Sequence, residues 1–368
     1  MTASILDRLD RLADEHPGKL LYSYLDVNGD PIESYTYASF LHRAQAIAGH
    51  LLKDGRFAAG DRLLLAYPPG LEMICAFFGC VRAGLIPVPV YPPSLRGYQS
   101  ALYKMVHIAK DCQAAGILTS RDYHASLKTN LARNGVSASG VDVDYISGLP
   151  WIVTEDFVDT ISHRLAVDPS NILFLQYTSG STMEPKGVIV THENILNTAP
   201  LVIDHPAPVV VSWLPQYHDM GLIGTYLYPA LRGGTTYGFS ATDFIQRPIL
   251  WFEAMTAYRA TATTAPNFAY DYCLRAGRLS KESLEACDLS SLRGLMCAAE
   301  PVKADTYTRF LEVFQAYGLK SESFYVAYGL AENTLAVSLR GRNIVAVNKR
   351  ALALGKARMI SELSLIHI

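Results

Sequence analysis

The chain has 368 residues, of which 50% are hydrophobic and 18% are charged, and its formal net charge is −2 at pH 7. This length exceeds what one hydrophobic core usually covers, so we expect at least two lobes. The near-neutral charge without a basic stripe disfavours nucleic acid as a partner.

The sequence indicates a soluble, cytoplasmic protein. Charged residues interrupt the first apolar residues, so we expect no signal peptide, and no apolar run reaches the length of a membrane span. The six cysteines show no CxxC spacing. Such cysteines are typical of small core residues in a reducing compartment.

The first elements are predicted from periodicity and turn signals. Residues 1–16 form an amphipathic helix. Two strands, Leu20–Leu25 and Ile32–Tyr35, flank the turn sequence Asn28-Gly29-Asp30, which is a strong hairpin signal. Apolar residues at helical spacing from Phe40 to Leu52 predict a second long helix.

From Asp61 onward, strands and helices alternate. The predicted elements are strand Arg62–Tyr67, helix Leu71–Ala83, strand Leu85–Val90, helix 99–113 and strand Gly116–Ser120. Continuous apolar strands separated by helices indicate an α/β fold whose parallel sheet is covered on both faces. Residues 121–150 contain scattered Gly, Ser and Asn, and we expect looser surface structure there.

A polar loop between two apolar strands is the first candidate site. Ile172–Leu175 and Val188–Val190 read as the strands, and the loop between them contains Thr178, Ser179, Gly180, Ser181 and Thr182. Backbone N–H groups and hydroxyls of such a loop can bind an anion, and Lys186 adds a positive charge. The alternative is an ordinary polar hairpin, because Ser- and Gly-rich turns are common.

Further candidates follow strands at their carboxyl ends, where ligands of open α/β sheets bind. The strand Val209–Leu214 leads to His218 and Asp219. The alternative, that His218 is only a helix-start residue hydrogen-bonded to Asp219, is less favoured, because the motif and its position agree. A catalytic triad is disfavoured because the chain has no GxSxG elbow. After a helix at 244–258 and a strand at 261–264, Asn267 and Phe268 begin another helix.

Two later strands end in the same way. Leu292–Ala298 leads to Ala299-Glu300-Pro301, and Ser323–Ala327 leads to the segment Tyr328-Gly329-Leu330-Ala331-Glu332. A lone glutamate is more often a surface carboxylate. Together with a phosphate-binding loop, however, Glu332 is the best metal candidate, because magnesium is usually held by one or two carboxylates plus phosphate oxygens.

The loop residues 177–182 and 185–188 resemble the phosphate loop of the adenylate-forming enzymes, which include acyl-CoA synthetases, luciferases and peptide-synthetase adenylation domains. Residues 213–222 resemble the fatty acyl-AMP ligases in particular, as do Tyr67-Pro68-Pro69-Gly70 and residues 89–93. One departure is Met183, where the family usually has a small residue.

The resemblance implies that ATP and Mg²⁺ activate a fatty acid as an acyl-adenylate, with release of pyrophosphate and transfer to an acyl carrier protein or a polyketide or peptide synthase module. It also implies residue roles. His218 and Lys186 would be catalytic, and Glu332 would bind the metal. The residues that would bind the nucleotide are Thr178, Ser179, Gly180, Ser181, Thr182, Ala298, Ala299, Glu300, Pro301, Tyr328, Gly329 and Leu330. Those that would bind the substrate are Trp213, Asp219, Gly221, Asn267 and Phe268.

The resemblance covers residues 15–358. We therefore expect the large N-terminal domain of adenylate-forming enzymes, with two packed α/β subdomains and part of a smaller β subdomain. In this interpretation residues 1–358 are the adenylation domain, incomplete at its C-terminal end, residues 359–368 are an unassigned tail, and the C-terminal small domain is absent. Three alternatives remain: an acyl-CoA synthetase, a nucleotide-binding fragment without catalysis and, more remotely, a serine hydrolase.

Overall fold

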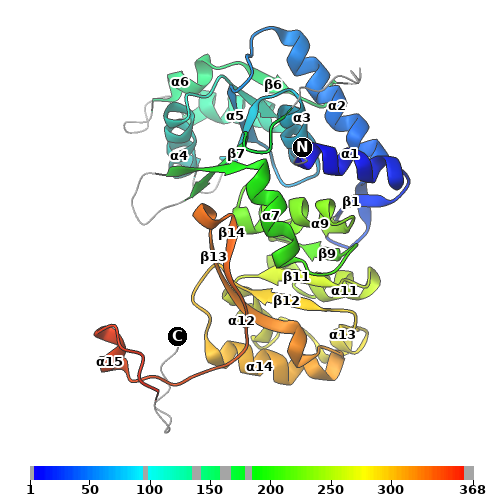
Figure 1. Cartoon of the computed structure of the whole chain (residues 1–368), viewed down its shortest axis with the longest axis vertical. Coiled ribbons are helices and arrows are strands. Elements are labelled where there is room, and N and C mark those ends of the chain that lie inside the picture. The colour runs from blue at the N-terminus through cyan, green and yellow to red at the C-terminus, as the bar shows by residue number, and fades with distance from the viewer. Residues whose placement is uncertain (1–3, 94–97, 135–141, 158–166, 179–184, 360–368) are drawn as a thin grey trace.

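The computed structural model describes residues 4–93, 98–134, 142–157, 167–178 and 185–359. These residues form an α/β fold with an eight-stranded, a four-stranded and a two-stranded sheet, all flanked by helices (Figure 1). Apolar residues of the two larger sheets belong to one continuous core cluster. The expectation of two packed α/β units is therefore confirmed.

The eight-stranded sheet is mixed. Its strand order is β14 (Leu335–Gly341), β13 (Phe324–Leu330), β12 (Gly294–Cys297), β11 (Ala262–Ala265), β9 (Val209–Ser212), β10 (Thr235–Gly238), β1 (Leu20–Leu25) and β2 (Pro31–Thr36). The inner strands from β13 to β1 run parallel, so their carboxyl ends share one edge. The two outer strands are antiparallel because each is joined to its neighbour by a hairpin.

The other sheets lie on the opposite side of that edge. Strands β4 (Ile86–Pro89), β3 (Arg62–Ala66), β5 (Gly116–Thr119) and β6 (Trp151–Val153) are all parallel. Strands β7 (Ile172–Thr178) and β8 (Lys186–Thr191) form an antiparallel hairpin, and β7 lies beside β4. The two strands predicted on either side of the polar loop are thus confirmed, while residues 179–184 between them lie outside the described residues.

The helices start where the sequence supplies capping residues. Ser4, Thr36 and Thr191 each accept a hydrogen bond from the backbone of the first turn, and this satisfies N–H groups that the helix leaves unpaired. The α-helices are α1 (Ile5–Glu15), α2 (Tyr37–Asp54), α3 (Glu72–Arg82), α4 (Tyr98–Asp111), α5 (Arg121–Asn134), α6 (Val143–Gly148), α7 (His192–Val202), α8 (Asp219–Gly221), α9 (Tyr228–Leu231), α10 (Ala241–Gln246), α11 (Ile249–Ala257), α12 (Asn267–Leu274), α13 (Lys281–Glu285), α14 (Ala304–Phe314) and α15 (Lys349–Ala353).

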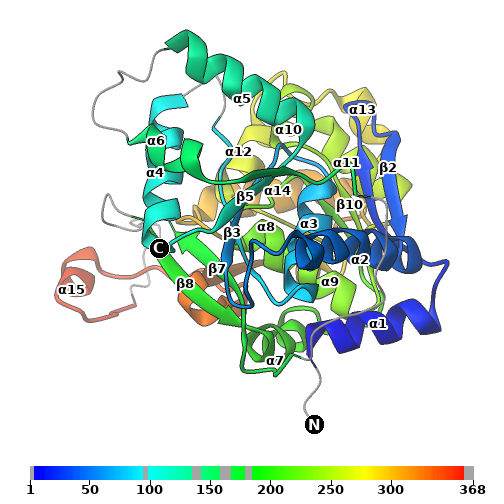
Figure 2. The ribbon, with the colours of Figure 1, turned by 90° about the horizontal axis from the view of Figure 1, so that it is seen from above.

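Shorter helical turns complete the chain. They are the π-helix at Leu222–Leu227 and three 3₁₀ turns at Gln315–Tyr317, Ser321–Ser323 and Ala331–Asn333. Beyond β14, the described residues add helix α15 and one isolated bridge between Val347 and Met359. This segment projects from the body of the molecule in both ribbon views (Figures 1 and 2).

Three sequence expectations were wrong in detail. Residues 121–134 form helix α5 and not loose structure, because the Gly- and Ser-rich part of that window begins only after the helix. The helix expected at 244–258 is divided into α10 and α11 at Pro248, which cannot continue a helix. Strand β13 runs on to Leu330, because the unforeseen strand β14 pairs with it.

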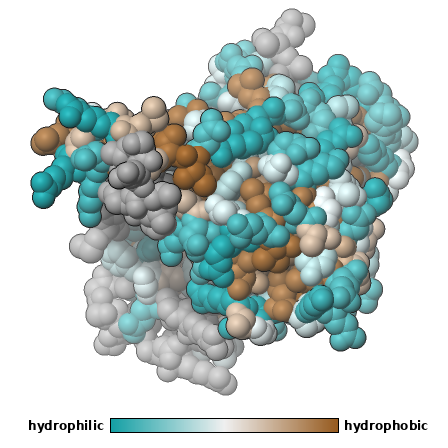
Figure 3. All heavy atoms as spheres, turned by 90° about the horizontal axis from the view of Figure 1, so that it is seen from below, coloured by the Kyte–Doolittle hydropathy of each residue, from teal (hydrophilic) through white to brown (hydrophobic). Residues whose placement is uncertain are grey.

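The positions of the cysteines and of the polar residues are those expected from the composition. All six cysteines are free and buried, as predicted. The face seen in Figure 3 carries many polar residues with groups of apolar residues between them, which is ordinary for a folded domain. Within the described ranges, no helix is both long and apolar enough to cross a bilayer.

A largely buried ion pair ties α2 and α3 to the segment after β6. The Arg43 guanidinium contacts the Glu72 carboxylate and donates to the Thr154 and Phe157 carbonyls at 2.9 and 2.6 Å. We expect Arg43→Ala to lower the free energy of unfolding by about 3 kcal/mol, because the largely buried Glu72 carboxylate loses its counter-charge and keeps only the hydrogen bond from Thr154 Oγ1. Urea unfolding measures this. The exposed Arg56, paired with Asp54 at the end of α2, is the control, and Arg56→Ala should change stability by less than about 1 kcal/mol.

Candidate functional site

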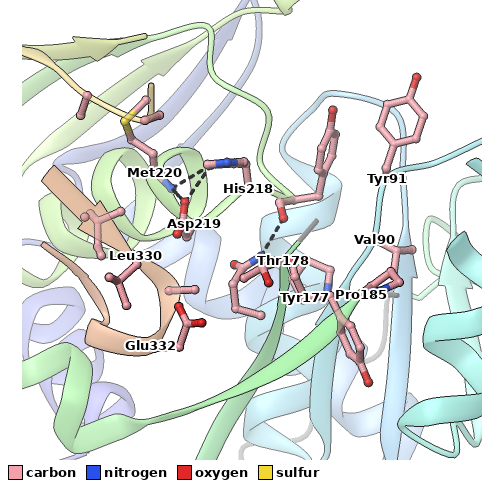
Figure 4. A pocket seen from close by; sticks show the side chains of 18 of the residues that line it. Val90, Tyr91, Tyr177, Thr178, Pro185, His218, Asp219, Met220, Leu330 and Glu332 are labelled. Atoms are coloured by element: carbon pink, nitrogen blue, oxygen red, sulfur yellow. Dashed lines mark hydrogen bonds and ion pairs between the residues drawn. The ribbon is translucent and has the colours of Figure 1, made fainter. Parts of the chain in front are cut away.

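A cavity of about 690 Å³ lies between the carboxyl edge of the large sheet and the opposing elements β4, β7 and α4 (Figure 4). Its walls come from segments far apart in sequence: residues 89–91, 100–108, 176–178, 217–220, 296–299 and 327–339. This volume is in the range of small-molecule sites, which are mostly apolar with a few convergent polar groups. The predicted meeting of strand ends at one edge is therefore observed.

His218 and Asp219 form a hydrogen-bonded pair on this cavity. The turn after β9 places His218 at the N-cap of α8, and its Nδ1 lies 2.8 Å from Asp219 Oδ1. The Met220 N–H also donates to Asp219 Oδ1 at 2.6 Å, which fixes the carboxylate (Figure 4). The hydrogen bond to Asp219 raises the pKa of His218, so the imidazolium persists to higher pH than in an isolated histidine. A half-exposed cation at a cavity can attract an anionic group.

Glu332 and Tyr328 lie on the opposite wall of the cavity. Tyr328 is 60% exposed, so its ring is free to stack on a planar ligand. Glu332 is exposed in the 3₁₀ turn after β13, and no ion-pair partner of it occurs among the described residues. Groups of three or more His, Cys, Asp or Glu with metal-binding geometry are likewise absent from the described ranges. A single carboxylate without an ion-pair partner in the described part of the chain fits magnesium, because most magnesium ligands are phosphate oxygens and water.

The segment that follows β12 forms part of the cavity wall with two small residues. Ala298 and Ala299 line the cavity, whereas Glu300 and Pro301 do not. Ala299 has φ +71°, a left-handed conformation that costs a non-glycine residue about 1 kcal/mol or more. Such strain is common at ligand sites, and the strained residue Ala299 lies on the cavity wall. The Glu300 carboxylate instead accepts a hydrogen bond from the Phe268 N–H.

The remaining predicted residues lie elsewhere. Trp213 is buried and stacked on Phe244 with ring centroids 4.1 Å apart. Gly221 is buried in α8, and the Asn267 side chain accepts a hydrogen bond from the Lys303 N–H at 3.0 Å. Phe268 is 41% exposed but does not line this cavity.

The polar loop is only partly described. Thr178 lines the cavity, and Lys186 is exposed at the start of β8 without lining it. Residues Ser179, Gly180, Ser181, Thr182 and Met183 lie outside the described residues.

Sequence reasoning missed several lining residues. Gln176 donates from Nε2 to the Tyr217 carbonyl at 3.1 Å and so connects β7 to the His218 turn. Lys104 lines the cavity from α4, together with Ser100, Met105 and Ile108. Their three- and four-residue spacing does indicate one helix face. Nothing in the sequence, however, indicates that this face is opposite the strand ends.

Gly329 lines the cavity at a position where the backbone of the neighbouring strand β14 approaches closely. A Cβ at this position would lie 1.8 Å from the Leu335 carbonyl oxygen, across the β13–β14 hairpin. We expect Gly329→Ala to push the two strands apart, to destabilise the protein by about 1–3 kcal/mol and to weaken nucleotide binding. Calorimetric titration with ATP and thermal unfolding measure both effects. Gly148→Ala, where a Cβ meets nothing within 4 Å, is the control. Wild-type ATP affinity in Gly329→Ala would show that the hairpin does not shape the site.

Comparison with known proteins agrees with this geometry. The model of the AMP-binding enzyme family matches residues 9–357. The medium-chain-fatty-acid–acyl-carrier-protein ligase JamA of Moorena producens is 33% identical over 367 residues, covering 97% of this chain and 60% of JamA. The 4-hydroxyphenylalkanoate adenylyltransferase of Mycobacterium tuberculosis is 32% identical over 354 residues, covering 92% of this chain and 55% of that protein.

A solved structure shares the fold. The fatty acyl-adenylate ligase from L. pneumophila, crystallised with acyl adenylate and pyrophosphate, superposes with a TM-score of 0.80 at 34% identity, covering 91% of this chain and 56% of that one. The expected fold class is confirmed by this match. This chain spans about 55–60% of the length of these relatives. Because the family model matches nearly the whole sequence, the chain belongs to the AMP-binding enzyme family.

Proposed function

We propose that the protein activates a fatty acid with ATP to give an acyl-adenylate and pyrophosphate. The observation that carries this proposal is the convergence of four residues on one cavity. His218 follows β9 and Tyr328 and Glu332 lie at the end of β13, both at the carboxyl edge of the large sheet, and Thr178 ends the opposing hairpin strand β7. The similarity to JamA and to the L. pneumophila ligase supports a fatty acid as the substrate.

In the proposed reaction, a carboxylate oxygen attacks the α-phosphorus of ATP. The new bond joins that oxygen to the α-phosphorus, the bond from phosphorus to the β-bridging oxygen breaks, and pyrophosphate leaves with the bonding electrons. The protein has little covalent chemistry to perform, so positioning and charge neutralisation dominate. His218, which lines the cavity beside Asp219, would offset the charge of the carboxylate and the α-phosphate as a cation.

The other residues would hold the nucleotide. Tyr328 would stack on adenine, the backbone of Ala298 and Ala299 would line the adenine edge, and residues 178–182 with Lys186 would bind the β- and γ-phosphates. Glu332 would hold magnesium, which neutralises phosphate charge when bound. Of the predicted substrate contacts, Asp219 would act by orienting His218.

The proposal also includes the boundaries of the adenylation domain and the acceptor of the acyl group. Residues 1–358 would form one adenylation domain, and the acyl group would pass to an acyl carrier protein or a synthase module in the cytoplasm. JamA, which is named as a ligase for a carrier protein, supports this acceptor. Coenzyme A is the competing acceptor.

Mass spectrometry tests the proposal. The protein is incubated with ATP, magnesium and a panel of fatty acids, and we expect acyl-AMP and pyrophosphate in equal amounts. Added carrier protein or coenzyme A then shows which thiol accepts the acyl group. Binding of ATP without acyl-AMP from any acid would contradict the proposed reaction.

A further inference from the structure

The side chain of Gln176 joins the two sides of the cavity. Gln176 lies two residues before Thr178, the last residue of β7, and only 2% of its surface is exposed. Its Nε2 donates to the Tyr217 carbonyl at 3.1 Å and to the Tyr177 carbonyl at 3.3 Å. The Tyr217 carbonyl belongs to the peptide bond that precedes His218. The hydrogen bond therefore connects the strand that carries Thr178 to the turn that carries His218 (Figure 4).

The contacts of the Gln176 amide define what this side chain can do. The two carbonyl oxygens fix the orientation of the amide, because the reverse orientation would place Oε1 against both of them. Both amide hydrogens are thus used within the protein, and none is left to donate to a ligand. Oε1 is buried and has no partner among the described residues. Since an unpaired buried acceptor is unfavourable, the amide contributes little net stability, and its main effect is to hold two segments together.

The next residue holds the same strand from its other face. Successive side chains of a strand point to opposite faces, so Tyr177 points away from Gln176. The Tyr177 hydroxyl donates to the carboxylate of Asp111 at the end of α4. Its ring packs on Gly187 of β8, where a Cβ would lie 2.8 Å from the nearest ring carbon. The strand is therefore held on both faces directly before the polar loop, and the Gln176 contact is the one that reaches the opposing turn.

We propose that Gln176 is a positioning residue for the adenylation step, which sets where the polar loop lies relative to His218. This inference rests on the proposed function. The acid would be held at His218 and the β- and γ-phosphates at the polar loop, so each reactant has its own contacts on its own side of the cavity. Attack on the α-phosphorus also requires that the two sides lie correctly relative to each other. A misplacement of about 1 Å between bound reactants can cost about a hundredfold in rate.

The first test is Gln176→Met, which keeps the length of the side chain and removes the donor. We expect kcat for acyl-AMP formation from decanoic acid to fall about ten- to a hundredfold. KM for ATP and for the acid should change by less than about threefold, because each ligand keeps its own contacts. Unchanged kcat, or a loss confined to KM, would overturn the inference.

Tyr272→Phe is the matched control for the loss of a buried hydrogen bond. The Tyr272 hydroxyl also donates to a backbone carbonyl, that of Ile245 at 2.8 Å, and joins α12 to α10. Tyr272 does not line the cavity, so its variant should keep wild-type kcat. Circular dichroism shows whether both variants are folded under the assay conditions. An equal loss of kcat in the two variants would mean that Gln176 acts only through general stability, which contradicts the proposal.

Gln176→Glu separates the hydrogen bond from the packing of the side chain. An ionised carboxylate cannot donate to the Tyr217 carbonyl, whereas a protonated carboxyl can donate one hydrogen bond. Burial raises the pKa of a carboxyl at this position, so mild acid restores the donor. The rate of Gln176→Glu relative to wild type should therefore rise as pH is lowered from about 8 to about 6, and the ratio for Gln176→Met should stay constant. Ratios that are equal and independent of pH in both variants would show that packing alone matters and would overturn the inference.

The same measurements separate this inference from the proposed function. Acyl-AMP formation by the wild-type protein together with an unchanged kcat in Gln176→Met would overturn only the positioning role. If the wild-type protein formed no acyl-AMP, the proposed function would fail, and the positioning role, which depends on that reaction, would fail with it.

Discussion

Replacing Glu332 by Gln should reduce acyl-AMP formation by about a hundred- to thousandfold, the range found when one preorganised charge-stabilising group is removed. Gln has nearly the same shape but lacks the negative charge that magnesium requires. Because Glu332 is exposed and forms no ion pair with a described residue, the fold should be unaffected. The measurement is the rate of acyl-AMP formation across a magnesium titration, with unfolding by urea as the check on stability.

A matched control for this prediction is Glu312→Gln. Glu312 is also exposed, but it lies on α14 and does not line the cavity. Its variant should keep wild-type activity and magnesium dependence. If Glu332→Gln behaves in the same way as the control, Glu332 is not a metal ligand and the metal site must involve other residues.

His218→Ala should lower the rate of acyl-AMP formation by about a hundredfold, because the cation beside the reacting carboxylate and α-phosphate is lost. The wild-type rate should also depend on pH in a defined direction. The hydrogen bond to Asp219 raises the pKa of His218, so the active imidazolium is present below that pKa and is lost as pH rises through it. Activity should therefore decline on the alkaline side.

Asp219→Asn tests the physical origin of this pH dependence. Without the carboxylate, the pKa of His218 falls towards its ordinary value, so the decline in activity should move to lower pH. His205→Ala is the control, because His205 also lies beside an aspartate, Asp204 at 3.3 Å, but does not line the cavity. An alkaline limb that is identical in wild type, His218→Ala and Asp219→Asn would show that another group titrates.

Local signals in the sequence were sufficient for most elements. The Asn28-Gly29-Asp30 turn, the capping residues Thr36 and Thr191 and the apolar runs depend on neighbours a few residues away, so a reader of the sequence can place them. Likewise, a strand followed by polar residues indicates a carboxyl end. This reasoning located His218, Tyr328 and Glu332, which the structure brings to one cavity.

Tertiary structure decided what local patterns do not encode. Lys104 and Gln176 line the cavity because α4 and β7 lie opposite the sheet edge, whereas Trp213 does not line it and stacks on Phe244. These contacts join residues tens to hundreds of positions apart, and their free energy depends on packing that no short window contains. The sequence by itself determined most of the strands, several turns and the polar residues that follow the strands, but not β6, β10 or β14. Which of those residues face a common space was decided by how the sheets pack together.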